Sequence, residues 1–155
     1  MLPIKKILCP TDFSEPSHES IATAKELAEH FAAELHVVTV VEPVPVMAAP
    51  PAPMTFNVLS YQKELEAAAK RDLENLVQSR IPDRIAVRKD VLLGPAAHEI
   101  VRYAEEECVD MIIIASHGRT GIQRFLFGSV AEKVARLAAC PVLIIHAPQA
   151  ESNEE

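Results

Sequence analysis

The fold class is decided by the run MIIIASHG, residues 111 to 118, in which four apolar residues stand in succession before a polar, glycine-containing turn. Neighbouring side chains of a strand point to opposite faces, so a strand that is apolar at every position is buried on both faces. Such burial is typical of a parallel sheet covered by helices on both sides. We therefore predict a strand of this kind over residues 111–114.

Comparable runs alternate along the chain with segments of helical spacing. Further strands are predicted at residues 4–9, 35–41 and 142–145, and a weaker one at 85–93, where Lys89 interrupts the alternation. The predicted helices lie around residues 21–31, at about 61–79, after Pro95 and from about Ser129. This β-α alternation predicts an α/β fold, a single-domain doubly wound five-stranded parallel sheet with helices on both faces. Ser14 or Ser17 would cap the first helix.

Length and composition narrow the class of protein. The chain has 155 residues, 49% of them hydrophobic, which fits one domain with a packed core. Its 15 basic and 22 acidic residues give a net charge of −7, which argues against a general nucleic-acid surface. No apolar run reaches the length of a membrane span and no signal-peptide pattern opens the chain, so we expect no membrane partner and a cytoplasmic location. The cysteines Cys9, Cys108 and Cys140 are expected to be free thiols.

Two segments stand apart from the predicted domain, which covers residues 1–147. Five of the twelve prolines fall between Pro43 and Pro53, so residues 43–57 are expected to form a loop or lid. Residues 148–155 are polar and acidic and are expected to form a flexible tail.

A doubly wound sheet adds its strands first to one side of the first strand and then to the other, beginning with the fourth strand. A ligand site is expected at the crevice that this change leaves, at the carboxyl ends of the first and fourth strands. The sequences CPTDFS (9–14) and ASHGRTG (115–121) follow those strands. Three of the four glycines lie between residues 118 and 128, and Gly128-Ser129 opens a helix whose free amides could hold an anion. The alternatives are a plain loop with Ser129 as the N-cap, and an Asp12 that merely caps a turn. Arg119 would neutralise phosphate charge or be a solvated loop residue.

At these residues the sequence resembles the universal stress protein family over nearly the whole chain. The ATP-binding branch of that family carries G-x-x-G, nine residues, then G-[S/T]. Here Ala115 to Gly118, nine residues and Gly128-Ser129 reproduce the spacing, with Ala115 in place of the first glycine. Residues 7–14, and Gly94-Pro95 before the third predicted helix, also look like the family.

The resemblance implies a Rossmann-like or flavodoxin-like sheet in the order 3-2-1-4-5, a cytoplasmic homodimer and bound ATP, with Mg²⁺ or Mn²⁺ assisting. The small side chain of Ala115 would still let the backbone approach the ligand. The residues implied to hold the adenine and ribose are Pro10, Thr11, Asp12 and the backbone of Val40, and those implied to hold the phosphates are Gly118, Gly128, Ser129 and Val130.

The last predicted strand suggests how two copies would associate. Residues Val142, Leu143, Ile144 and Ile145 would form an apolar strand at the edge of the sheet. An uncovered edge of this kind invites aggregation, so pairing with the same strand of a second copy is expected.

Three functions follow, in this order of preference. The first is an ATP-binding stress-response regulator, a binding module for an unknown protein partner. It would hydrolyse ATP slowly at most, because Gly128-Ser129 lacks the lysine of a P-loop. The alternatives are a nucleotide-free interaction module of the same family and an enzyme of the adenylyl-transfer or ATP-pyrophosphatase type.

Overall fold

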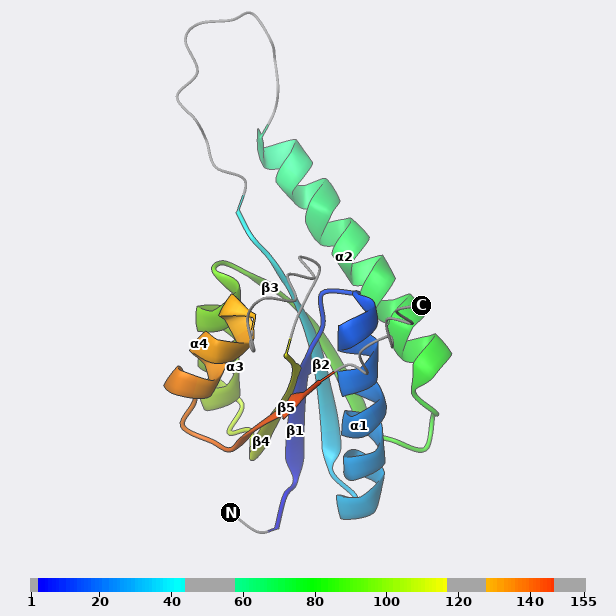
Figure 1. The fold of residues 1–155 in the computed structure, drawn as a ribbon. Coiled ribbons are helices and arrows are strands. Elements are labelled where there is room, and N and C mark those ends of the chain that lie inside the picture. The colour runs from blue at the N-terminus through cyan, green and yellow to red at the C-terminus, as the bar shows by residue number, and fades with distance from the viewer. Residues whose placement is uncertain (1–2, 44–57, 117–127, 147–155) are drawn as a thin grey trace, which may run out of the picture.

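A five-stranded parallel sheet forms the centre of the molecule (Figure 1). The structure, a computed structural model, describes residues 3–43, 58–116 and 128–146. The strands are β1 (Lys6–Pro10), β2 (Glu34–Val41), β3 (Val87–Leu93), β4 (Met111–Ala115) and β5 (Val142–Ile145). Their order is β3-β2-β1-β4-β5, and each neighbouring pair is parallel, which confirms the predicted fold class and strand order.

Helices cover both faces of the sheet in pairs. They are α1 (Glu15–Phe31), α2 (Val58–Arg80), α3 (Ala96–Glu106) and α4 (Ser129–Leu137). One hydrophobic cluster joins the sheet to α1 and α2, and a second joins it to α3 and α4. Figure 1 shows α1 and α2 on one side of the strands and α3 and α4 on the other.

The central strand β1 shows why its sequence is apolar at successive positions. Ile7 and Cys9 belong to the cluster under α1 and α2, whereas Leu8 belongs to the cluster under α3 and α4. All three side chains are completely buried. Double-faced burial of this kind is what the apolar runs predicted.

The weak alternation predicted for β3 has a structural cause. Helix α2 packs its C-terminal half on the sheet through the buried Leu73 and Leu76, while its N-terminal half extends beyond the strands (Figure 1). Lys89 lies on the part of β3 that this divergence leaves open, so a charged side chain is tolerated there.

Residues at the helix starts match the patterns that predicted them. Ser14 is the N-cap of α1, and its hydroxyl accepts a hydrogen bond from the Ser17 amide. Gly94, directly before Pro95, the N-cap of α3, has φ +145°, a backbone conformation that favours glycine over residues with a side chain.

The described parts of the chain contain no helix that is both long and apolar enough to cross a membrane. The predicted loop over residues 43–57, except Pro43, and the predicted tail over residues 148–155 lie outside the described residues.

Candidate site at the carboxyl edge of the sheet

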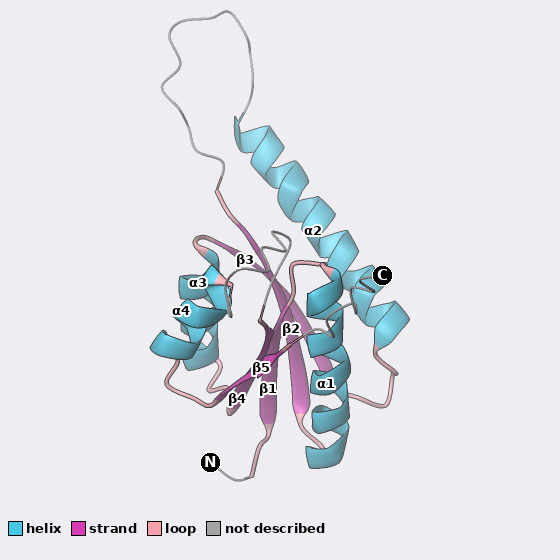
Figure 2. Cartoon of the chain, in the orientation of Figure 1, coloured by secondary structure: helices cyan, strands magenta, loops and turns pink. Residues whose placement is uncertain are grey.

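The loop after β1 is fixed to its neighbours by hydrogen bonds. The Thr11 amide donates to the Val38 carbonyl of β2 at 2.8 Å, and the Thr11 and Ser17 hydroxyls lie 2.9 Å apart. Pro10 and Thr11 are buried, whereas Asp12, like Phe13 and Ser14 after it, is partly exposed. Figure 2 shows this loop crossing the carboxyl edge of the sheet on its way into α1.

Asp12 is the cap of a tight turn. Its Oδ1 atom accepts hydrogen bonds from the Ser14 hydroxyl at 2.5 Å and the Ser14 amide at 3.1 Å. Phe13, between them, has φ +64°, a left-handed conformation that a non-glycine residue adopts at a cost. Turn capping was one interpretation of Asp12 from the sequence, and this turn is present. It holds the Asp12 carboxylate in one orientation at the end of β1.

The end of β4 carries the second half of the site. Ala115 is buried, 8% exposed, and Ser116 follows it, 1% exposed. The Ser116 amide donates to the Ile145 carbonyl at 2.8 Å, and the Gly128 amide donates to the Ser116 carbonyl at 2.5 Å. The two ends of the chain between Ser116 and Gly128 are thus hydrogen-bonded to each other at the tip of β4. Gly118 and Arg119 lie outside the described residues.

This hydrogen bond brings the N-terminus of α4 to the carboxyl edge. Gly128 is the N-cap with an extended backbone, φ −67° and ψ 149°, and it offers no side chain to cap the first turn. Ser129 and Val130 open the helix at the surface, with Val130 37% exposed. The first amides of a helix lack intrahelical acceptors and carry the positive end of its dipole, so they suit an anion.

Val40 completes the set of predicted residues that the structure describes. It lies near the end of β2, opposite Leu92 of β3, and is partly buried against the α3 and α4 cluster. β1 lies between β2 and β4 in the sheet. The predicted site residues that the structure describes therefore come from three neighbouring strand ends and from the start of one helix.

Sequence reasoning missed three hydroxyl residues that build this edge. Ser14 was interpreted only as a helix cap, yet its hydroxyl also holds the Asp12 carboxylate, and the Ser17 hydroxyl lies beside that of Thr11. Ser116 holds Gly128 through its backbone carbonyl. The signal for Ser14 and Ser17 in the sequence was the concentration of small hydroxyl residues after the first strand.

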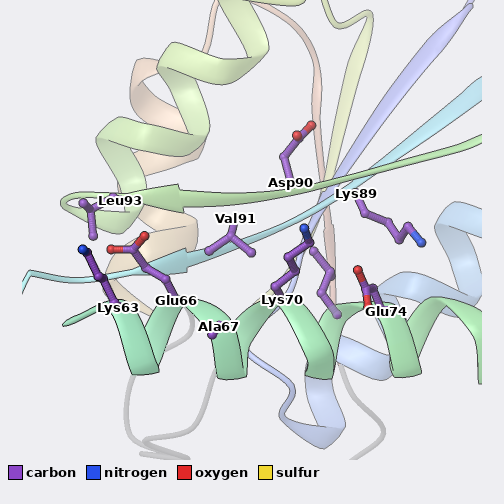
Figure 3. A pocket seen from close by; sticks show the side chains of 10 residues that line it. Lys63, Glu66, Ala67, Lys70, Glu74, Lys89, Asp90, Val91 and Leu93 are labelled. Atoms are coloured by element: carbon purple, nitrogen blue, oxygen red, sulfur yellow. The ribbon is translucent and has the colours of Figure 1, made fainter. Parts of the chain in front are cut away.

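A separate hollow of about 630 Å³ lies between the diverging half of α2 and β3 (Figure 3). Its lining includes three lysines and three carboxylates: Lys63, Glu66, Lys70, Glu74, Lys89 and Asp90. In Figure 3, Asp90 points away from α2, whereas the helix side chains reach toward β3. Because lysines and glutamates stand side by side in the rest of the lining, it selects no ligand charge, and we assign this hollow no binding role.

No metal centre is formed by the side chains that the structure describes. Among them, no group of three or more histidine, cysteine, aspartate or glutamate residues is placed to hold an ion.

The comparison with protein families gives this edge a context. The model of the universal stress protein family matches residues 3–146. The chain belongs to the universal stress protein family.

Two of its universal stress protein relatives come from the archaeon Methanocaldococcus jannaschii. Universal stress protein MJ0531 is 33% identical over 147 residues, which are 95% of this chain and 85% of that protein. The solved structure of MJ0577 is 30% identical, covers 95% of this chain and 99% of its own, and superposes with a TM-score of 0.73.

A second solved structure is that of a universal stress protein in complex with cAMP. It covers 94% of this chain and 99% of its own, with a TM-score of 0.66 and 22% identity. At that identity the likeness establishes a shared fold.

Proposed function

We propose that this universal stress protein binds ATP at the carboxyl edge of its sheet and acts as a nucleotide-dependent binding module. The observation that carries the proposal is the hydrogen bond from the Gly128 amide to the Ser116 carbonyl. It sets the uncapped N-terminus of α4 beside the strand end that follows Ala115, in the crevice where doubly wound folds bind ligands.

In this proposal the site has two halves. Pro10, Thr11 and Asp12 hold the adenine and ribose side, where the backbone of Val40 also contributes. The phosphates lie against Gly128, Ser129 and Val130, with Gly118 and Arg119 supplying further contacts and Mg²⁺ or Mn²⁺ accompanying the ligand. The small side chain of Ala115 is compatible with the proposal, because it adds only one methyl group where the family motif has glycine.

The role assigned to the nucleotide is regulatory. We place the protein in the cytoplasm, where the bound nucleotide would favour one conformation that a protein partner recognises. Gly128-Ser129 carries no P-loop lysine to stabilise a transferred phosphate, so turnover stays far below the roughly 10 per second of an ordinary enzyme.

The proposal is tested by direct binding of Mg-ATP to protein purified without added nucleotide, measured by calorimetry after chromatographic analysis of any molecule released on denaturation. Gly128→Val should weaken binding by at least about tenfold, because the added side chain stands over the helix amides that hold the phosphates. Ala135→Val is the matched control, since Ala135 is an exposed residue of the same helix away from its N-terminus.

Wild-type protein that neither releases nor binds a nucleotide would overturn the proposal and favour the nucleotide-free interaction module. Equal ATP affinity of Gly128→Val and Ala135→Val would show that the phosphates do not bind at the N-terminus of α4.

We also propose a homodimer that pairs β5 with the same strand of a second copy. β5 is the last strand of the sheet, and Leu143 is 38% exposed on it. A strand edge offers unpaired backbone groups that a second strand satisfies.

Light scattering after size-exclusion chromatography is expected to give the dimer mass at micromolar concentration. Leu143→Glu should shift the mass to the monomer, whereas Leu137→Glu, at a comparably exposed leucine of α4, should leave the dimer intact. A wild-type monomer would contradict this interface.

A further inference from the structure

Two of the three cysteines lie together at the amino edge of the sheet, opposite the candidate nucleotide site. Cys108 follows the C-cap of α3, and Cys140 lies between α4 and β5. Both line one hollow of about 320 Å³, whose other residues come from the end of α3 and from the two turns.

The hydrogen bonds of the sheet keep the two turns side by side. Ile112 pairs with Val142, and the Ile112 amide donates to the Pro141 carbonyl at 2.9 Å. Cys140 therefore lies level with Asp110, two residues along the chain from Cys108. Val109, between these residues, has its amide bonded to the Ala104 carbonyl at 2.9 Å, which holds the turn against α3.

The two thiols differ in their surroundings. Cys108 is exposed, and its φ of +53° places it on a sharp turn at the surface. Cys140 is half-buried, and burial raises the pKa of its thiol above the ordinary value. Thiolate character and access govern the reaction of cysteine with oxidants, so Cys108 is the thiol that meets an oxidant first.

We propose that Cys108 and Cys140 form a peroxide-responsive dithiol pair that closes to an intramolecular disulfide. The Cys108 thiolate attacks a hydroperoxide oxygen, the O–O bond breaks, and water or an alcohol leaves, so Cys108 becomes a sulfenic acid. The Cys140 sulfur then attacks the Cys108 sulfur, the S–O bond breaks, and hydroxide departs with the Cys140 proton as water. Two thiols are oxidised by two electrons and one peroxide is reduced.

The product would tie the two turns of the amino edge together. The covalent ring would enclose β4, the chain that follows it and α4, so oxidation would restrict the separation of these elements. Pairs of this kind respond to oxidants in compartments where structural disulfides are rare.

The experiment treats the fully reduced, full-length protein with hydrogen peroxide and measures its intact mass and its non-reduced peptides. The expected result is the loss of two hydrogen atoms and a linked peptide that joins Cys108 to Cys140. Dithiothreitol should restore the reduced mass. A disulfide requires Cα atoms within about 7 Å, so the linked peptide reports directly on the spacing of the two turns.

Three single variants separate the roles. In Cys140→Ser, Cys108 should accumulate as a sulfenic acid that dimedone labels; in Cys108→Ser, the linked peptide should be lost without dimedone labelling of Cys140. Cys9→Ser is the matched control and should form the disulfide as the wild type does, because Cys9 is fully buried. Wild-type protein that gives dimedone-labelled Cys108 or Cys108-linked dimers in place of the internal disulfide would overturn the proposal.

Discussion

Tyr103→Phe is expected to lower the free energy of unfolding by about 2 kcal/mol, because it removes the hydroxyl at the centre of a partly buried hydrogen-bond network. That hydroxyl donates to Asp90 Oδ2 at 2.6 Å and lies 3.0 Å from the Nδ1 atom of His36. Tyr103 is 5% exposed and His36 is completely buried. Phenylalanine would leave the completely buried His36 without this contact, whereas the Asp90 side chain, which is 32% exposed, could turn to water.

The single hydroxyl proton fixes the direction of the chain of hydrogen bonds. Because Tyr103 gives its proton to Asp90, its oxygen can only accept from His36, so Nδ1 of His36 carries a proton. Asp90 also accepts from Arg88 at 2.9 Å, and Arg88 bonds to Glu107 at 2.6 Å. Hydrogen bonds to charged groups are the stronger ones, which is why a single oxygen atom matters here.

Urea denaturation of the wild type and the variant measures this loss. Arg102→Gln is the control on the same helix, since Arg102 bonds to Glu99 and Glu106 at the exposed surface and its removal should change stability little. Equal effects of Tyr103→Phe and Arg102→Gln would show that the buried network contributes no more than a surface ion pair.

The stability of the wild type is expected to fall relative to Cys9→Ala as the pH rises above about 9. Burial raises the pKa of the Cys9 thiol from 9.0 to about 12, opposed in part by its contact with Ser20 at 3.7 Å. A thiol with a raised pKa keeps its proton in the folded state, whereas the unfolded chain releases it at lower pH. The contribution of the Cys9 thiol to the free energy of unfolding is therefore complete below about pH 9, and it is lost as the pH rises toward about 12.

The cost per pH unit rises toward about 1.4 kcal/mol in this interval, so the stability advantage of wild type over Cys9→Ala should shrink by about 1.6 kcal/mol between pH 9 and 10.5. The raised pKa of Tyr103 acts in the same direction in both proteins and cancels from the difference. Parallel urea titrations of both proteins at several pH values measure the difference in their free energies of unfolding. A difference between wild type and Cys9→Ala that stays constant with pH would contradict the prediction.

The sheet could be predicted from the sequence because burial on both faces leaves a direct pattern. The predicted strand at residues 142–145 coincides with β5, and the one at 111–114 is a residue shorter than β4. The second helix was predicted at about residues 61–79, but α2 spans Val58–Arg80. Its first turns extend beyond the sheet and bury little, so apolar spacing did not mark where it begins.

The candidate site was predictable in its location and less so in its construction. Topology places the residues after β1 and β4 at one edge whatever their identity. The hydrogen bonds of Ser14 to Asp12 and of Gly128 to Ser116 depend on backbone angles that no periodicity records. The same holds for the contact of His36 with Tyr103, 67 residues away, since distant side chains meet only after the sheet and α3 have packed.

The strand order has a consequence for the growing chain on the ribosome. β1 pairs on one side with β2, Ile7 with Leu35, and on the other with β4, Ile7 with Met111. The first neighbour is synthesised soon after β1, but the second emerges only when most of the chain has been made. The half-sheet of β1, β2 and β3 must therefore present the open side of β1 to its surroundings throughout that interval. During synthesis, a strand that ends buried on both faces is therefore the one whose edge waits longest for its partner.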